Sequence, residues 1–420
     1  MTRRVLILSA DIGDGHTTAA RSLATALSER GAEVHVDETL RSLGRLQAFV
    51  LRDGSRLLFR FAPRLFHLYY RLLLLCGPAR ALAARSLVRF GARPLLRMIA
   101  EHRPDVVVST YPATTVVLGA LRRCGRVPMP AVATITDLAG LFFWAHPGID
   151  LHLVNWAESV EEVLAVAPHS EVRAVAPLTS AAFFRATARG EARRRLELPA
   201  AGRVVVVSGG GWGVGDLAGA VEEVSSVPGT FTVCLAGHAE RVRRDLATRF
   251  DHRPDIRVLG FTEGMSDLLA AADVLVHATG GMTCLEAGLR DCPVVLYGFA
   301  IGHVRHNAES MERRGLVWRA QHRAELAPLV DRLPSGPTRR ASPGIVPAAE
   351  LVLAARAQAP VEGRRAWARA RLRLATALVA ATATTAFATT EPGEAVVHRV
   401  EALHHHGARP PHHAHAPPTR

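Results

Sequence analysis

Short apolar runs alternate with longer stretches of helical periodicity through most of the chain. Eleven of these runs are predominantly apolar and do not alternate with a period of two, which is typical of strands buried on both faces of a parallel sheet. They lie at 5–9, 33–36, 105–109, 131–136, 150–154 and 172–176 in the first half, and at 203–208, 230–236, 256–260, 273–277 and 293–298 in the second. The pattern predicts an α/β protein built from doubly wound parallel sheets.

A polar, arginine-rich stretch at 187–202 separates the two sets of strands. It predicts two Rossmann-like domains facing across a cleft, one over 1–180 and one over 200–345. The segment 333–344 is rich in proline, glycine and serine, and we expect it to end the second domain.

The C-terminal region has a different composition. Residues 346–392 are rich in Ala and Arg and predict a helical segment, within which 17 uncharged residues at 374–390 follow a basic flank. This run is short for a membrane span and only weakly hydrophobic, so a membrane anchor and an Ala-rich helix are both open. We expect the His- and Pro-rich tail at 393–420 to be disordered and assign its histidines no role.

The charge balance is basic, with 51 Lys and Arg against 38 Asp and Glu. This balance favours anionic partners, such as phosphates or an acidic membrane surface, without choosing among them. The five cysteines are scattered with no CxxC pair, which argues against a disulfide framework or a zinc site. The apolar run that opens the chain is too short for a signal peptide and predicts a first strand.

Residues 41–97 carry twelve arginines and a single acid, Asp53, interleaved with Leu, Phe and Tyr. One interpretation is a helical insertion whose apolar face is core and whose arginines are solvated. The other is a basic amphipathic surface that lies on an anionic bilayer. The depletion of acids is hard to explain by packing alone.

The first candidate site is the segment SADIGDGHTTAARSLATAL at 9–27. A strand ends at Ser9, a glycine-containing loop follows, and a helix begins near Thr17, a turn that exposes backbone N–H groups and favours negative charge. His16 lies where open α/β sheets place ligands, and its imidazole is suited to accept a proton from a substrate hydroxyl. A polar helix cap without chemistry is the other interpretation. The loop is not GxGxxG, so we expect no dinucleotide.

Two further glycine turns follow strands of the second half. Five glycines occur between Gly209 and Gly215, where bare backbone donors are accessible to a phosphate, and no Lys-Ser/Thr pair follows to make a Walker loop. In HATGGMTCLEAG (277–288), a glycine pair opens a helix whose first turn carries Thr283. Glu286 is placed to accept two hydroxyl hydrogen bonds, as a ribose diol would offer.

These motifs together resemble the donor-binding domain of GT-B glycosyltransferases. The nearest group is that of monogalactosyldiacylglycerol synthase and processive diacylglycerol glucosyltransferase, and the transferase that adds N-acetylglucosamine to the peptidoglycan lipid intermediate is a relative. The resemblance rests on GGxTxxEA, PxxxY and GxxxxNA in order, on the similarity of 9–23 to GGGHxxAA, and on a ThrAsp…Trp…Asp stretch at 134–154. It covers roughly residues 5–330.

The resemblance implies roles position by position. His16 would act near the acceptor hydroxyl, and Asp137 is the ThrAsp acid facing the cleft, so either would serve as base. Glu286 would bind the uridine ribose, and Asn307 follows the sugar-contacting loop. The implied donor-binding residues are Gly209, Gly210, Gly211, Gly280, Gly281, Thr283, Glu286, Gly302, His303 and Asn307.

Three positions depart from the pattern of this group. Thr279 stands where a proline usually precedes the glycine pair. Gly302, His303 and Val304 stand where Gly-Gln-Glu is frequent, which leaves the donor sugar open. Leu141 replaces a histidine between ThrAsp and Trp, which affects the expected acceptor geometry.

The function implied is inverting transfer of a hexose from a UDP-sugar to a lipid acceptor, in first place diacylglycerol, in glycolipid synthesis. The enzyme would be peripheral on the cytoplasmic membrane face, bind an anionic membrane surface and no nucleic acid, and need no cofactor. No DxD-like acid pair adjoins the donor loops, so we expect no metal.

Several alternatives are open. One is transfer of N-acetylglucosamine, to another lipid or to a soluble acceptor. Another is a UDP-sugar epimerase, against which the composition of 41–97 argues. The last is a UDP-sugar binder at the membrane that has lost catalysis, which Leu141 and Val304 would best support.

Overall fold

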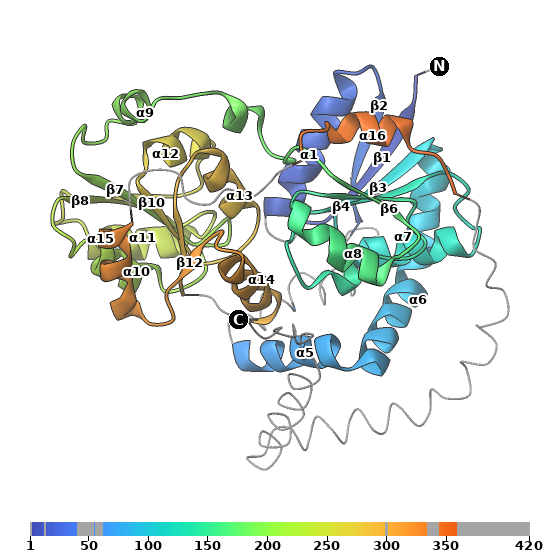
Figure 1. The fold of residues 1–420 in the computed structure, drawn as a ribbon, viewed down its shortest axis with the longest axis horizontal. Coiled ribbons are helices and arrows are strands. Elements are labelled where there is room, and N and C mark those ends of the chain that lie inside the picture. Colours follow the sequence, from blue (N-terminus) through green and yellow to red (C-terminus); the bar gives the residue numbers. More distant parts are fainter. Residues whose placement is uncertain are drawn as a thin grey trace, which may run out of the picture. The chain divides into compact units, whose positions relative to one another are not determined.

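The computed structural model of the chain describes residues 2–11, 14–39, 54, 62–298, 301–333 and 344–358. The uncharged run at 374–390, the tail at 393–420 and most of the first third of the 41–97 segment lie outside these residues. Residues 1–362 form one compact unit, which contains two parallel sheets (Figure 1).

The first sheet has the strand order β2-β1-β3-β4-β5-β6, with every pair parallel. The order of the strands reverses between β1 and β3, and open α/β sheets place ligands at such switch points. The strands are β1 (Arg4–Ser9), β2 (Glu33–Glu38), β3 (Val106–Ser109), β4 (Ala131–Ile135), β5 (Leu151–Val154) and β6 (Glu171–Ala174).

The second sheet has the order β12-β11-β10-β7-β8-β9, also parallel, and its switch point lies between β7 and β10. Its strands are β7 (Arg203–Ser208), β8 (Thr230–Leu235), β9 (Ile256–Leu259), β10 (Val274–His277), β11 (Val294–Leu296) and β12 (Trp318–Arg319). All eleven predicted strands are confirmed. The twelfth strand, β12, was not predicted, because two residues are too short to leave a pattern in the sequence.

Helices cover both faces of each sheet (Figure 1), which explains why the strands are continuously apolar. Around the first sheet they are α1 (Asp14–Ser28), α6 (Gly77–His102), α7 (Pro112–Arg123) and α8 (Val160–Val166). Around the second they are α10 (Leu217–Val224), α11 (Glu240–Arg249), α12 (Met265–Ala271), α13 (Met282–Leu289), α14 (Gly302–Arg313) and α15 (Leu326–Arg332). Short 3-10 turns lie at Leu141–Phe143, Ala157–Ser159, Ala181–Phe184 and Arg323–Glu325.

The described part of the arginine-rich segment is helical, with one buried and one exposed apolar part. The C-terminal half of α6 buries Leu95, Met98 and Ile99 in the core of the first sheet. The preceding helix α5 (Pro63–Leu75) instead exposes apolar side chains, with Leu65 49% and Leu75 46% exposed. The segment is therefore anchored by α6 and presents an apolar surface on α5.

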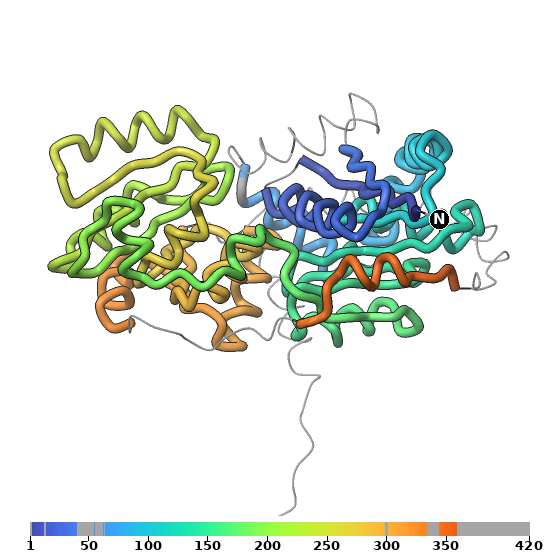
Figure 2. The backbone as a smooth tube through the Cα atoms, turned by 90° about the horizontal axis from the view of Figure 1, so that it is seen from above, coloured from blue at the N-terminus to red at the C-terminus, as the bar shows by residue number. Residues whose placement is uncertain are grey.

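After the second sheet, the chain returns to the first. Val346 forms a parallel bridge with Val175, and α16 (Ala348–Ala354) buries Ala349 and Val352 in the same core as α1. Figure 2 shows α16 in orange beside the blue α1. The start of the predicted 346–392 segment thus belongs to the first domain, and no helix in the described ranges is long and apolar enough to cross a membrane.

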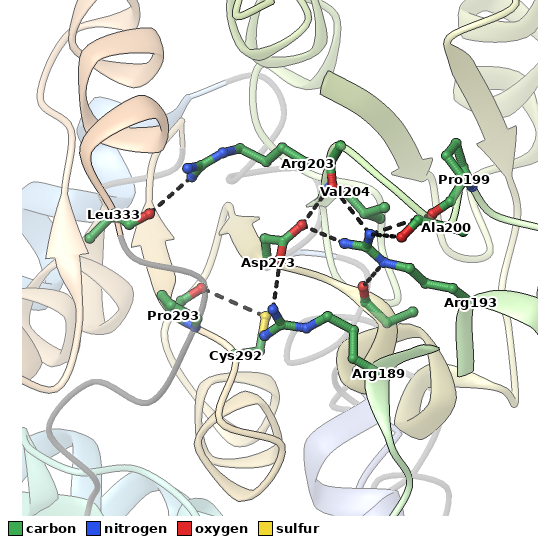
Figure 3. Close-up of polar contacts among 12 residues, drawn as sticks. Arg189, Arg193, Pro199, Ala200, Arg203, Val204, Asp273, Cys292, Pro293 and Leu333 are labelled. Carbon is green, nitrogen blue, oxygen red and sulfur yellow. Dashed lines mark hydrogen bonds and ion pairs between the residues drawn. The ribbon is translucent and has the colours of Figure 1, made fainter. Parts of the chain in front are cut away.

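The arginine-rich linker is held by a buried ion-pair network (Figure 3). Arg193, in α9 (Arg189–Arg195), donates to the Asp273 carboxylate at 2.6 Å, and Arg189 donates to it at 2.9 Å. Arg193 and Asp273 are 5% and 3% exposed. Asp273 precedes β10, so this network lies at the amino end of the second sheet, opposite the glycine turns. Arg193 also donates to the carbonyl oxygens of Pro199, Ala200, Gly202 and Ala271.

Candidate active site

A cavity of about 880 Å³ is lined by both domains at the carboxyl ends of their strands. A volume of this size suits a nucleotide-sized ligand. Four of the predicted donor-binding residues line it, namely Gly210, Gly211, Thr283 and Glu286. Other lining residues include Asp14 and Arg21 of α1 and the turn Gly260–Glu263 that follows β9.

Glu286 lies in the second turn of α13 and is only 9% exposed, because its helix neighbours Leu285 and Ala287 are core residues. The Thr179 hydroxyl, in the loop after β6, donates to Oε1 of Glu286 at 2.5 Å. Burial raises the pKa of Glu286 to about 7, and the hydrogen bond from Thr179 opposes this shift. A carboxyl group of the second domain is thus held by a hydroxyl of the first, beside the cavity.

The glycine turns leave room where other residues would not. A Cβ on Gly211 would lie 1.5 Å from Oδ2 of Asp14, so the absence of a side chain at Gly211 lets the Asp14 carboxylate of α1 lie against this turn. At Gly281, a Cβ would meet no atom within 4 Å, and no side chain caps α13, which begins at the next residue. The first N–H groups of α13 are therefore available to an anion.

His16, Asp137 and Trp144 form a second group of side chains on the first domain. The imidazole of His16 lies 5.3 Å from the Trp144 ring and 5.4 Å from the Tyr111 ring, centroid to centroid. Trp144 donates through Nε1 to the Asp137 carboxylate at 3.0 Å. Nδ1 of His16 is buried and has no hydrogen-bond partner among the described residues.

Burial lowers the pKa of His16 to about 4, Asp137 opposes this shift, and His303 adds to it. A hydrogen bond with the Thr110 backbone also raises this pKa. The imidazole is therefore neutral at pH 7, which is the protonation state of a proton acceptor. His303, near the start of α14, has its pKa lowered by burial and raised by Asp137, so all three groups act on one another.

Asn307 makes three hydrogen bonds within the protein. Its Oδ1 accepts hydrogen bonds from the N–H groups of Leu138, at 3.0 Å, and Ala139, at 3.2 Å. Its Nδ2 donates to the Gly280 carbonyl at 3.1 Å. Asn307 therefore joins the glycine turn of the second domain to the loop that carries Asp137.

The predicted sugar-contacting loop meets α5. The Gly302 N–H donates to Nδ1 of His67 at 3.2 Å, and a Cβ on Gly302 would lie 2.3 Å from the Phe66 ring. The His303 ring lies 6.4 Å from Phe66 and 6.1 Å from Tyr70. These residues of α5 were not predicted for the site. The sequence marked them only by an unusual density of aromatic residues and His within the arginine-rich segment.

Thr279, the departure before the glycine pair, forms a hydrogen-bond chain. Its hydroxyl lies 3.0 Å from Nε2 of His277, whose Nδ1 lies 3.1 Å from the Ser208 carbonyl oxygen. Burial lowers the pKa of His277 to about 4, so the ring is neutral, with Nδ1 donating and Nε2 accepting. These two hydrogen bonds connect the turn after β10 to the turn after β7. His277 was not among the residues predicted for the site.

Seven of the predicted site residues fall into two groups. Four line the cavity, while His16, Asp137 and His303 lie together outside its lining. Asn307 and Gly280 connect the two domains, and Gly209 packs against the backbone of Gly213 without lining the cavity. Within the described ranges, no cluster of three or more His, Cys, Asp or Glu could hold a metal ion.

The chain is similar in sequence to known glycosyltransferases of glycolipid synthesis. The family model of monogalactosyldiacylglycerol (MGDG) synthase matches residues 16–174. The processive diacylglycerol beta-glucosyltransferase of Bacillus subtilis (strain 168) is 26% identical over 319 residues, which cover 74% of this chain and 82% of the relative. The enzyme of that name from Bacillus cereus (strain 03BB102) is 24% identical over 323 residues, which cover 74% and 80%.

Among solved structures, the spinosyn rhamnosyltransferase SpnG complexed with thymidine diphosphate has a TM-score of 0.51 to this chain. It is 16% identical and covers 79% of this chain and 91% of its own. This similarity concerns the fold, and with the two parallel sheets it confirms the predicted pair of Rossmann-like domains.

Proposed function

We propose that this chain, which belongs to the monogalactosyldiacylglycerol synthase group of GT-B glycosyltransferases, transfers a hexose from a UDP-sugar to diacylglycerol with inversion. One observation carries the proposal. A cavity of nucleotide size, with a glycine turn and a buried carboxyl group, adjoins the helix that bears a neutral histidine. Nδ1 of this histidine has no hydrogen-bond partner in the part of the chain that the structure describes. Gly15, which precedes this histidine, lines the same cavity.

The donor would bind in the cavity. The diphosphate would lie against the N–H groups of the Gly210 turn and of the first turn of α13, where the helix dipole favours negative charge. Glu286 would accept hydrogen bonds from the ribose. Phe261, 52% exposed at the cavity and stacked on His238 with centroids 4.0 Å apart, offers an aromatic face to the base.

Transfer would be a single displacement. The acceptor hydroxyl oxygen forms a bond to the anomeric carbon of the hexose, and the bond from that carbon to the diphosphate oxygen breaks, so that UDP leaves. The hydroxyl proton passes to His16, and the neighbouring Asp137 stabilises the imidazolium that results. The charge that develops on the leaving diphosphate is stabilised by the backbone N–H groups of the glycine turns.

A lipid acceptor is supported by α5. Its outer side exposes Leu65, Leu72 and Leu75, and Arg64 beside them is exposed too. Its inner side contacts the sugar loop through His67 and Gly302. Insertion of these leucines into the cytoplasmic face of an anionic bilayer would bring the site to its acceptor.

The test is product formation by the full chain with diacylglycerol in anionic vesicles and either UDP-glucose or UDP-galactose. We expect a glycolipid from at least one donor, and His16→Ala should slow transfer about a hundredfold or more while leaving the Kd of UDP unchanged. No lipid product from either donor would contradict the proposal. UDP-N-acetylglucosamine completes the panel, because the residues at 302–304 leave the sugar open.

A further inference from the structure

Tyr70 carries a buried hydroxyl for which the described residues provide no hydrogen bond. The residue lies on the inner side of α5 and is 9% exposed, and its Oη has no partner. Burying a hydroxyl without a hydrogen bond destabilises a protein, so such a group is usually explained by a ligand or a water molecule that completes it.

The hydroxyl lies beside the loop that carries Asp137. A Cβ on Gly140, which has φ +77°, would lie 2.4 Å from Oη of Tyr70. Burial and the charge of Asp137 both raise the pKa of Tyr70, so the phenol keeps its proton and is a hydrogen-bond donor at neutral pH. The ring lies 6.1 Å from His303 and 5.7 Å from Phe142, which fixes its position between the two domains.

In the proposed transfer the hexose and the acceptor hydroxyl meet near His16 and Asp137, and the Tyr70 hydroxyl lies beside the loop that carries Asp137. In the first turn of α14, His303 is the polar side chain near Tyr70, because Gly302 has no side chain and Val304 is apolar and 6% exposed. A sugar hydroxyl needs partners that donate and accept, and a phenol does both. The unpartnered Oη supplies such a group from outside the second domain.

We propose that the Tyr70 hydroxyl binds a hydroxyl of the hexose that is transferred, and that it is a specificity-determining residue of this enzyme. The inference rests on the proposed function, since it names a contact to the sugar of the same donor. It makes α5 a two-sided element, with leucines toward the lipid and a tyrosine toward the sugar.

The first test is Tyr70→Phe, which removes one oxygen and keeps the ring. Because Oη has no hydrogen-bond partner among the described residues, the Tm of the unliganded variant should equal or exceed that of the wild type. The kcat/KM for the donor should fall roughly tenfold, while the Kd of UDP, which has no hexose, stays unchanged. The matched control is Tyr69→Phe, since Tyr69 is adjacent on α5 and 49% exposed, and it should transfer at the wild-type rate.

The second test uses donors that each lack one hexose hydroxyl, applied to the wild type and to Tyr70→Phe. We expect one deoxy donor to be poor with the wild type and no worse with the variant, because the same hydrogen bond is already absent. A wild type that does not discriminate against any deoxy donor would overturn the inference, and so would a variant that matches the wild type or has a lowered Tm. If the wild type releases no UDP from any donor, the proposed function fails as well.

Discussion

The amide of Asn307 accepts a hydrogen bond from the backbone N–H of Leu138 at 3.0 Å, across 169 positions of the sequence. Asn307 is 1% exposed, so this bond and its neighbour from Ala139 are shielded from water. The loop that carries the acid of the first domain is therefore held by the helix that follows the sugar loop of the second. The Asn307 side chain thus contacts both the loop of Asp137 in the first domain and the glycine turn of the second.

Asn307→Ala should weaken both stability and transfer. The variant leaves two buried N–H groups without acceptors, which costs about 2 kcal/mol, and it frees the loop of Asp137. Urea unfolding measures the first effect, and kcat with UDP-sugar and lipid measures the second. Unchanged stability would mean that the two domains are held together elsewhere.

UDP binding should strengthen as the pH rises through about 7, the value to which burial raises the pKa of Glu286. The reason is that the ionised carboxylate accepts hydrogen bonds at both oxygens, whereas the protonated form loses part of this capacity. Calorimetric titration with UDP at pH values on either side of this pKa measures the change in Kd.

Glu286→Gln is the control for this pH dependence, since its amide does not titrate. The variant should bind UDP more weakly than the ionised wild type, with a Kd that is nearly flat in this range. A variant that keeps the pH dependence would assign it to another group.

Asp273→Ala should destabilise the fold by about 3 kcal/mol or more, because it leaves the Arg193 guanidinium buried without its carboxylate. The matched control is Asp255→Ala, whose partner Arg253 is 37% exposed, and which should cost less than about 1 kcal/mol. Urea unfolding measures the stability of the two variants.

The Kd of UDP for the folded Asp273 variant should be unchanged, since Asp273 and Arg193 lie at the end of the strands away from the cavity. A marked loss of UDP binding would show that the linker affects the site.

Replacing Leu65, Leu72 and Leu75 of α5 together by Ser should reduce binding to anionic vesicles and lower the kcat/KM for lipid. Each exposed leucine contributes about 2 kcal/mol when it is fully buried in an apolar phase. Co-sedimentation with vesicles measures binding, and UDP affinity should stay the same. Leu164→Ser on α8, where the leucine is 38% exposed, is the control. Equal vesicle binding by the triple variant and the control would place the membrane contact elsewhere.

Much of the architecture was predictable because it depends on local patterns. A strand buried on both faces must be apolar at every position, so β7 and β10 were visible as the runs at 203–208 and 273–277. The glycine turns were visible for a similar reason, since Gly210, Gly213 and Gly215 have positive φ, which favours glycine.

By itself, then, the sequence determined the strands, the glycine turns, the division into two domains and the resemblance to a family. Only the tertiary structure decided that Asn307 joins two loops and that α16 returns to the first sheet. It also decided that the Tyr70 hydroxyl lies at the junction of the domains with no hydrogen bond from any described residue. The physical reason is that burial and turn geometry constrain residues that are neighbours along the chain. They therefore leave a hydrophobic period or a characteristic composition in the sequence. Contacts between residues more than a hundred positions apart leave no such pattern, because either partner alone is compatible with many other surroundings.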